Sequence, residues 1–301
     1  MCKTDPDNAF MVHNEAISRL RETALEVTHG AAFRLRRWVH RANLPTVTAD
    51  DREILDALEL DGACASTLEA LGVPESAALL RDADRLMTEM TKQSSRPGGG
   101  KDYVVTASPA LIADYPAILR WGLDERLLAI AESYIGMPVT YRGVLARLDF
   151  PDGSVKETRL WHLDQEDTRI LKIVVYVNDV SDSGGPFEYI PASLKQPRNL
   201  AEGPKLRIND ADELAESVPP KHWRAVTGRR GTTAFVDTCR IFHRGRLPTA
   251  GVRQSLFFAY NSRWPMRPTH CNPLFEVERF VADNGPLAAH QKAALDFSYV
   301  R

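Results

Sequence analysis

The chain has little cysteine, no long apolar run and almost no net charge. Its four cysteines among 301 residues are widely scattered, and no two have the CxxC spacing. Such cysteines predict reduced thiols and argue against a disulfide framework or a cysteine-ligated zinc site. No apolar run is longer than a strand, so no membrane-spanning helix is expected. The stretch MCKTDPDNAFMVHNEA lacks the basic and then apolar order of a secretory signal, which predicts a cytoplasmic protein.

Positive and negative charges nearly cancel, because 38 Lys and Arg stand against 40 Asp and Glu. A chain with this balance has no field that attracts nucleic acid or an anionic membrane, so neither is expected as a partner. The remaining expectation is a small-molecule substrate, bound by a monomer or a homodimer. The chain has 301 residues, of which 44% are hydrophobic, so it is long and apolar enough to bury a large core.

The first 136 residues have the patterns of helices. NEAISRLRETALEV, TADDREILDALELDG, ESAALLRDADRLMTEM and LDERLLAIAESYIG show helical spacing of apolar residues or helix-capping residues at their ends. GAAFRLRRWVHRANLP carries a basic stripe that fits either a solvated helix face or a membrane or partner surface. Residues 95–101 contain a proline and three glycines; they predict a loop or a junction and are a candidate lid.

From Met137 onward, short strand-like runs such as RILKIVVYVNDV and RQSLFFAYN alternate with turns such as PDGS and SDSGGP. Runs of this length without long helices between them predict an antiparallel sandwich or jelly roll. We therefore predict one α+β domain over residues 1–301 with a mainly β core. Residues 1–136 form its helical part, residues 137–265 its β core and residues 266–301 its tail. A polar insertion over residues 195–226, with one helix in NDADELAESV, interrupts the core and is a second candidate lid.

The stretch WHLD, from Trp161 to Asp164, places a histidine and an aspartate two residues apart. Side chains alternate along a strand, so His162 and Asp164 share a face and Trp161 faces the opposite way, into the core. One imidazole and one carboxylate are two of the three ligands of the facial triad that binds Fe(II) in non-haem oxygenases. His243 ends the strand-like run TAFVDTCRIFH and is the best candidate for the third ligand.

Arg253 and Ser255, in the run VRQSLFFAY, are also two residues apart and share a face. A guanidinium can hold a carboxylate by two parallel hydrogen bonds, and the serine hydroxyl can add a third. Beside a facial triad, this pair fits the dicarboxylate 2-oxoglutarate, whose 2-oxo acid end chelates iron and whose distal carboxylate needs a fixed cation.

Residues 141–260 resemble the phytanoyl-CoA dioxygenase family of Fe(II)/2-oxoglutarate-dependent oxygenases. They match its HxD pair, its distal histidine and the arginine about ten residues beyond that histidine. YVNDVSDSGGPFEYIPAS resembles a strand–turn–strand segment of the family, although Pro-Ala-Ser-Leu replaces the family's Pro-Gly-Ser-His. The resemblance implies a double-stranded β-helix, a cupin-like jelly roll, flanked by N-terminal helices. It also implies specific ligands: His162, Asp164 and His243 for Fe(II), and Arg253, Ser255, Tyr176 and Lys172 for 2-oxoglutarate.

The family's reaction follows from the same resemblance. It uses O₂ to convert 2-oxoglutarate to succinate and CO₂ while it oxidises, most simply hydroxylates, an unactivated C–H bond. Related halogenases have a small residue in place of Asp164, so its presence favours hydroxylation, desaturation or ring formation over halogenation. The expected substrate is a small metabolite, for example of bacterial secondary metabolism. The alternatives are a zinc-dependent hydrolase or lyase on the same ligands and a non-catalytic ligand-binding or sensor protein of the same fold.

Several other residues allow two interpretations. Lys172 lies in an apolar strand, so it either faces an anion inside the barrel or extends to solvent from an edge. Tyr176 either packs in the core or contacts the co-substrate, and Asp237 is expected to accept backbone hydrogen bonds at a turn. The remaining candidates either contact the substrate or form a solvated rim or lid; they are Arg240, Arg244 and Trp223. The same two interpretations apply to Arg142 and Arg147 on the first strand.

Overall fold

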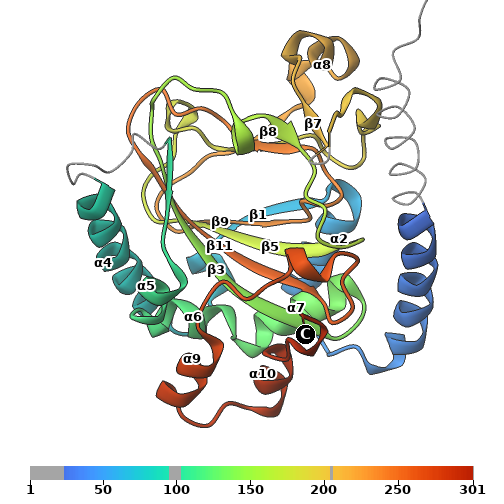
Figure 1. Cartoon of the computed structure of the whole chain (residues 1–301), viewed down its shortest axis with the longest axis vertical. Helices are drawn as coiled ribbons and strands as arrows, with labels where there is room; N and C mark the ends of the chain where they lie inside the picture. The colour runs from blue at the N-terminus through green and yellow to red at the C-terminus, as the bar shows by residue number, and fades with distance from the viewer. Residues whose placement is uncertain (1–23, 95–102, 204–205, 301) are drawn as a thin grey trace, which may run out of the picture.

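The computed structural model describes residues 24–94, 103–203 and 206–300. Two antiparallel sheets face each other, and most helices pack against the outer face of the larger sheet (Figure 1). The predicted combination of helices and a mainly antiparallel β core is therefore confirmed. The candidate lid over residues 95–101 lies outside the described residues, as does most of the expected helix in NEAISRLRETALEV. No described helix is long and apolar enough to cross a membrane.

The larger sheet has six strands and the smaller sheet has five. In spatial order, the larger sheet contains β1 (Ala63–Thr67), β9 (Thr232–Val236), β5 (Ile170–Tyr176), β11 (Arg253–Ser262), β3 (Val139–Asp149) and β2 (Val104–Thr106). The smaller sheet contains β7 (Arg207–Ile208), β4 (Trp161–His162), β10 (His243–Gly245), β6 (Phe187–Tyr189) and β8 (Arg224–Val226). From β3 to β6 and from β8 to β11, successive strands alternate between the two sheets.

Five of the described helices lie in stretches where the sequence predicts a helix. Thr48 and Asp51 form a capping box at the start of α2 (Ala49–Asp61), and Gly62 ends the helix in the left-handed conformation. The other elements with helical patterns are also confirmed: residues 24–40, α4 (Ser76–Ser94), α7 (Glu125–Ile135) and α8 (Ala211–Ser217). Shorter helices complete the layer: α3 (Leu68–Leu71), α5 (Pro109–Ala113), α6 (Pro116–Gly122), α9 (Val277–Asp283) and α10 (Ala289–Ala294).

Short strands appear in two regions where the sequence suggests only helix or loop. In the helical part, β1 and β2 extend the two edges of the larger sheet through pairing with β9 and β3. In the polar insertion, β7 pairs with β4, and β8 pairs with β6. Each of these strands has five residues or fewer. Pairing with a strand from elsewhere in the chain stabilises such segments, so their own sequences carry little pattern.

Alternation along the strands separates the apolar core into layers. On β5, Ile173 and Val175 belong to the core between the larger sheet and the helices, whereas Val174 and Tyr176 face the smaller sheet. Burying each aliphatic side chain of this kind contributes about 1.5–3 kcal/mol. A third cluster, which includes Trp161 and Leu163, covers the outer face of the smaller sheet. The space between the two sheets therefore holds both apolar and polar side chains, and the candidate site lies there.

Candidate metal centre

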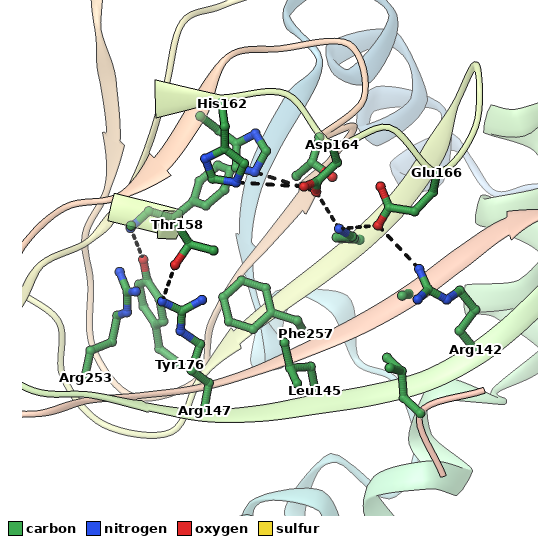
Figure 2. A pocket seen from close by; sticks show the side chains of 17 residues that line it. Arg142, Leu145, Arg147, Thr158, His162, Asp164, Glu166, Tyr176, Arg253 and Phe257 are labelled. Carbon is green, nitrogen blue, oxygen red and sulfur yellow. Dashed lines mark hydrogen bonds and ion pairs between the residues drawn. The ribbon is translucent and has the colours of Figure 1, made fainter. Parts of the chain in front are cut away.

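The three predicted metal ligands lie together on the inner face of the smaller sheet (Figure 2). His162 on β4 and His243 on β10 are direct cross-strand partners, and their ring centroids are 4.3 Å apart. The backbone N–H of Asp164 donates to the carbonyl of Thr238 at 2.9 Å, which fixes the turn after β4. The Nε2 atoms of His162 and His243 lie 3.8 and 3.7 Å from the Asp164 carboxylate oxygens. All three ligand atoms lie within 4.8 Å of one another, close enough to bind one ion.

Hydrogen bonds to the backbone orient both imidazoles. Nδ1 of His162 donates to the carbonyl of Leu160 at 2.8 Å, and Nδ1 of His243 donates to the carbonyl of Ile241 at 3.1 Å. Because a carbonyl only accepts, the proton is on Nδ1 and the Nε2 lone pair of each ring points toward Asp164. This arrangement is typical of metal-binding histidines. Among the described residues, this is the one group of three His, Cys, Asp or Glu side chains that could share a metal ion.

The protonation states also suit a metal site. Burial lowers the pKa of His162, and burial together with the neighbouring His162 lowers the pKa of His243 to about 3. Burial alone would raise the pKa of Asp164, but Lys172 and the two imidazoles outweigh it and hold that pKa below its ordinary value. The site therefore presents two neutral imidazoles and one carboxylate, the forms that bind a divalent ion.

A cavity of about 270 Å³ lies next to these ligands, between the two sheets. Figure 2 shows His162 and Asp164 above it, Arg253 and Arg147 toward one end, and Arg142 and Glu166 toward the other. The cavity is lined by polar residues around an apolar floor: Arg142, Leu145, Arg147, Thr158, His162, Asp164, Glu166, Lys172, Tyr176, Phe187, Thr238, His243, Gly245, Arg253, Phe257, Ala259 and Leu274.

Arg253 lies at the cavity with only 2% of its surface exposed. Its Nη2 is 2.9 Å from Oδ2 of Asp149, and its Nη1 donates to the carbonyl of Gly185. Arg147 reaches the same carboxylate, with Nη2 2.6 Å from Oδ1 of Asp149. Burial raises the pKa of Asp149, but Arg253 and Arg147 together hold it below the ordinary value. The guanidinium of Arg253 therefore lies at the cavity between the two sheets. It already shares an anion with Arg147, which was not predicted.

Ser255 faces the same way as Arg253 and Phe257, because the three residues are two apart along β11 and side chains of a strand alternate between its faces. Its side chain is fully buried, and its Oγ has no hydrogen-bond partner. Gly245 approaches the same place from β10, where an added Cβ would lie 2.7 Å from Nη2 of Arg253. Ser255 is not among the residues that line the cavity, so its predicted contact with a ligand would require the neighbouring side chains to move. A buried unpaired hydroxyl is costly unless a partner satisfies it, and Ser255 therefore keeps a free polar group close to this end of the cavity.

Lys172 and Tyr176 line the cavity from β5 but use their polar atoms differently from the prediction. Nζ of Lys172 is 2.5 Å from Oδ2 of Asp164 and 3.1 Å from Oε1 of Glu166, so its anionic partners belong to the protein. The hydroxyl of Tyr176 donates to the carbonyl of Val226 at 2.8 Å and accepts from the N–H of Phe187 at 2.9 Å. Tyr176 therefore presents its ring, and not an available hydroxyl, to the cavity.

Arg240, Arg244 and Trp223 do not line the cavity, which corrects their prediction as substrate contacts. Arg244 follows inward-facing His243, so it points to the outer face of β10, where its guanidinium stacks 4.7 Å from the centre of the Trp161 ring and 5.4 Å from that of Trp223. Arg240 donates to the carbonyls of Leu58 and Glu59 at the end of α2. Trp223 donates through Nε1 to the carbonyl of Val218 at 2.9 Å. Their partners indicate structural roles.

Three cavity residues could not be assigned from the sequence: Glu166 was not predicted, and Arg142 and Arg147 were left open. Glu166 is two residues beyond Asp164, so the spacing HxDxE would have placed it beside the ligands. Arg142 is directed into the cavity by a β-bulge, where the register of β3 against β11 shifts between Ala259 and Tyr260. Gly143, at φ +103°, lies at this bulge. A bulge reverses the alternation of side chains, so regular strand spacing could not assign Arg142.

Comparison with known proteins shows a likeness of fold. No protein-family model matches the chain, and no curated protein matches its sequence. The apo structure of EctD from S. alaskensis matches with a TM-score of 0.50 and 20% identity, over 72% of this chain and 78% of that chain. EctD with 2-oxoglutarate and 5-hydroxyectoine matches at 0.49 and 21%, over 81% and 86%. HygX from Streptomyces hygroscopicus with nickel and 2-oxoglutarate matches at 0.48 and 19%, over 72% and 88%. The apo EctD match shows that the chain shares the fold of that protein.

Proposed function

We propose that the chain is an Fe(II)- and 2-oxoglutarate-dependent oxygenase that oxidises, most simply hydroxylates, a C–H bond of a small molecule. The observation that carries the proposal is the convergence of His162, Asp164 and His243 beside a cavity that also contains the buried Arg253. EctD, whose fold the chain shares, has also been determined with 2-oxoglutarate and 5-hydroxyectoine bound. Neutral imidazoles and a carboxylate on one side of an ion leave positions open for co-substrate and O₂.

The proposed fold is a double-stranded β-helix, and the alternation of successive strands between two sheets supports it. The HxD pair, the distal histidine and the following arginine support membership of the phytanoyl-CoA dioxygenase family. We also propose that residues 1–301 form one domain, because β1 and β2 of the helical part belong to the same sheet as the core strands. A cytoplasmic monomer or homodimer remains the expected form.

The residues present fit both an iron ion and 2-oxoglutarate. The imidazoles of His162 and His243 are held with Nε2 toward Asp164, and the set of two nitrogens and one oxygen suits Fe(II). For 2-oxoglutarate, the cavity offers the guanidinium of Arg253. Ser255 does not line the cavity, but its unpaired hydroxyl is on the same face of β11, directly behind it. The absence of a Cβ at Gly245 leaves Nη2 of Arg253 in place. These groups would hold the distal carboxylate, and the metal ligands would hold the ion.

When bound, iron and 2-oxoglutarate supply the oxidising chemistry, in which O₂ and 2-oxoglutarate yield succinate, CO₂ and the oxidised substrate. The chain's own residues bind and orient the reactants. The carbonyls of Leu160 and Ile241 hold the two imidazoles in place, and Arg253 fixes one end of the co-substrate. Leu145 and Phe257 form an apolar floor opposite the ligands, which limits water near the reacting atoms.

The two alternatives account for fewer of these features. A zinc-dependent hydrolase or lyase would use the same three ligands and an open position for water. It would leave the buried guanidinium of Arg253 and the unpaired hydroxyl of Ser255 without a ligand. A non-catalytic ligand-binding protein would need the cavity but not two imidazoles prepared for a metal.

The proposal is tested by anaerobic reconstitution of the whole chain with Fe(II) and 2-oxoglutarate. The wild-type protein should develop the weak visible charge-transfer band of an iron–2-oxo acid chelate. His243→Ala should abolish the band, Arg253→Ala should raise the 2-oxoglutarate concentration that produces it at least tenfold, and the control His270→Ala, at an exposed histidine outside the cavity, should leave it unchanged. A wild-type protein that binds Fe(II) without forming the band would contradict the proposal.

A further inference from the structure

The positive and negative charges around the cavity do not balance, and the excess indicates the charge of the substrate. Among the described residues at the cavity, four cations stand against three carboxylates, if Asp149 behind Arg147 and Arg253 is included. The cations are Arg142, Arg147, Lys172 and Arg253, and the carboxylates are Asp149, Asp164 and Glu166. The charges of Fe(II) and of 2-oxoglutarate cancel each other. One positive charge therefore remains, and a buried charge is costly unless an anion pairs with it.

Arg142 is the cation with the weakest partners. Its Nη1 is 3.4 Å from Oε1 of Glu166, and its Nε is 3.3 Å from the carbonyl oxygen of Asn272. Arg147 and Arg253, in contrast, approach Asp149 to 2.6 and 2.9 Å. Glu166 is moreover shared with Lys172, which lies 3.1 Å from the same oxygen. The guanidinium of Arg142 is thus the group with the most remaining capacity to bind an anion.

The position of Arg142 separates it from the proposed 2-oxoglutarate end. Figure 2 shows Arg142 and Glu166 on the side of the cavity away from Arg253, with His162 and Asp164 between the two ends. Leu145 and Phe257 form the floor between them, and Leu274 lies beside Arg142 through a hydrogen bond from its N–H to the Arg142 carbonyl at 2.7 Å. A ligand at this end therefore meets the guanidinium of Arg142, the carboxylate of Glu166 beside it and an apolar surface.

We propose that Arg142 binds the carboxylate of the substrate, which is a small organic acid of net charge −1 whose hydrocarbon part lies on Leu145, Phe257 and Leu274. This inference rests on the proposed function, since it takes the metal and 2-oxoglutarate to occupy the rest of the cavity. A carboxylate matches the single remaining charge, whereas a phosphate monoester would carry nearly two. Glu166 limits the affinity, because its charge competes with the substrate for Arg142.

The test uses straight-chain monocarboxylic acids, from butanoate to octanoate, and their primary amides as probes. Binding is measured calorimetrically on the full chain loaded with Ni(II), which replaces iron without supporting turnover, and with 2-oxoglutarate. The wild-type protein should bind at least one acid about tenfold or more tightly than its amide, as a charge-assisted hydrogen bond predicts. Arg142→Met should remove this preference without changing amide or 2-oxoglutarate affinity, and Arg142→Lys should restore part of it.

Two further variants separate binding from general damage. Glu166→Gln should tighten acid binding several-fold, a direction that loss of structure would not produce. Arg279→Met, at an exposed arginine on α9, should behave as wild type. The inference is overturned if wild type shows no preference for acids, or if Arg142→Met weakens acids and amides equally. If 2-oxoglutarate itself does not bind the Ni(II) protein, the proposed function fails instead, and the acid–amide comparison on the Ni(II) protein still tests Arg142.

Discussion

At the scale of single residues, Arg253 depends on the absence of a side chain at Gly245. An added Cβ would lie 2.7 Å from Nη2 of Arg253, too close for a guanidinium held by Asp149 and Gly185 to tolerate without moving. Gly245→Ala should therefore displace the guanidinium and weaken 2-oxoglutarate binding about tenfold, a free-energy change of about 1.4 kcal/mol. Calorimetry on the Ni(II)-loaded protein measures it.

Gly184→Ala is the matched control for this prediction. A Cβ at Gly184 would find its nearest neighbour, on Val180, at an ordinary contact distance of 3.5 Å. The control should bind 2-oxoglutarate as wild type does, and both variants should keep the metal affinity of wild type. Equal 2-oxoglutarate affinity in Gly245→Ala and wild type would show that Arg253 is not the cation that holds the co-substrate.

Asp237 predicts a pH dependence of stability. Burial raises its pKa to about 6, although the hydroxyl of Tyr134 donates to it at 2.7 Å. An unfolded aspartate has a pKa near 3.9. Between these values, the folded chain keeps a proton that the unfolded chain has lost, so this contribution to stability is present at low pH and is lost as the pH rises through about 6.

Asp237→Asn removes that titration, since an amide has no proton to lose in this range. Between pH 4 and pH 7, the stability of wild type relative to Asp237→Asn should fall by about 2 kcal/mol, as a shift of about two pKa units implies. Urea unfolding of both proteins at several pH values measures the difference. A difference that stays constant with pH would mean that Asp237 does not titrate as described.

Single-residue roles could be predicted from the sequence where they depend on strand alternation alone. His162 and Trp161 point to opposite faces of β4 for that reason. Asp164 lies in the turn after the strand, where a hydrogen bond to Thr238 holds it beside His162. The partners of a side chain depend on strands far away in sequence. The pairing of Arg253 with Asp149, and of Lys172 with Asp164 and Glu166, was therefore not predictable.

At the scale of elements, the bulge in β3 positions Arg142. Gly143 has φ +103°, and an added Cβ would lie 2.5 Å from Cδ1 of Phe275. Gly143→Ala should lower the free energy of unfolding by about 2 kcal/mol, because it combines an unfavourable backbone conformation with a steric clash. It should also reduce the preference for acid probes, since Arg142 is directed into the cavity by this bulge. Chemical denaturation measures the stability.

Gly30→Ala provides a control of opposite sign. Gly30 lies in the helix over residues 24–40, where the nearest atom to an added Cβ is Nη1 of Arg34 at 3.6 Å. Alanine favours a helix interior over glycine by about 0.5–1 kcal/mol, so stability should rise. Similar stabilities for Gly143→Ala and wild type would contradict the importance of the bulge.

Arg240 connects two elements and does not line the cavity. Its guanidinium donates to the carbonyls of Leu58 and Glu59, two of the last carbonyls of α2, at 2.8 and 2.6 Å. Arg240→Ala should lower stability by about 2 kcal/mol, the contribution of hydrogen bonds from a charged donor, and leave metal and 2-oxoglutarate affinity unchanged. The exposed Arg229→Ala serves as control in the same denaturation and binding assays. If Arg240→Ala loses 2-oxoglutarate binding but keeps its stability, Arg240 contributes to the binding site and this account of it is wrong.

Elements with strong local patterns were predictable, and short strands were not. The capping box of α2 and the apolar spacing of α4 and α7 are local, so the sequence alone indicates these helices. The strands β1, β2, β7 and β8 exist because a strand from elsewhere in the chain pairs with each of them. Their own residues carry little strand pattern, and tertiary contacts decide them.

At the scale of the whole molecule, the two sheets bring together ligands from distant parts of the chain. His162 and Asp164 come from β4 and its following turn, and His243 comes from β10, some eighty residues later. The antiparallel pairing of β4 with β10 is what places the two imidazoles side by side. The central claim is that this pairing creates a site for one metal ion, on which 2-oxoglutarate binding and the substrate subsite both depend.

Anomalous diffraction from crystals prepared anaerobically with Fe(II) tests that claim most directly. The account predicts one iron peak per chain, bonded to Nε2 of His162, Nε2 of His243 and a carboxylate oxygen of Asp164 at roughly 2.0–2.2 Å, as for other first-row metals. An iron peak at any other place, or no peak within bonding distance of these three side chains, would contradict it.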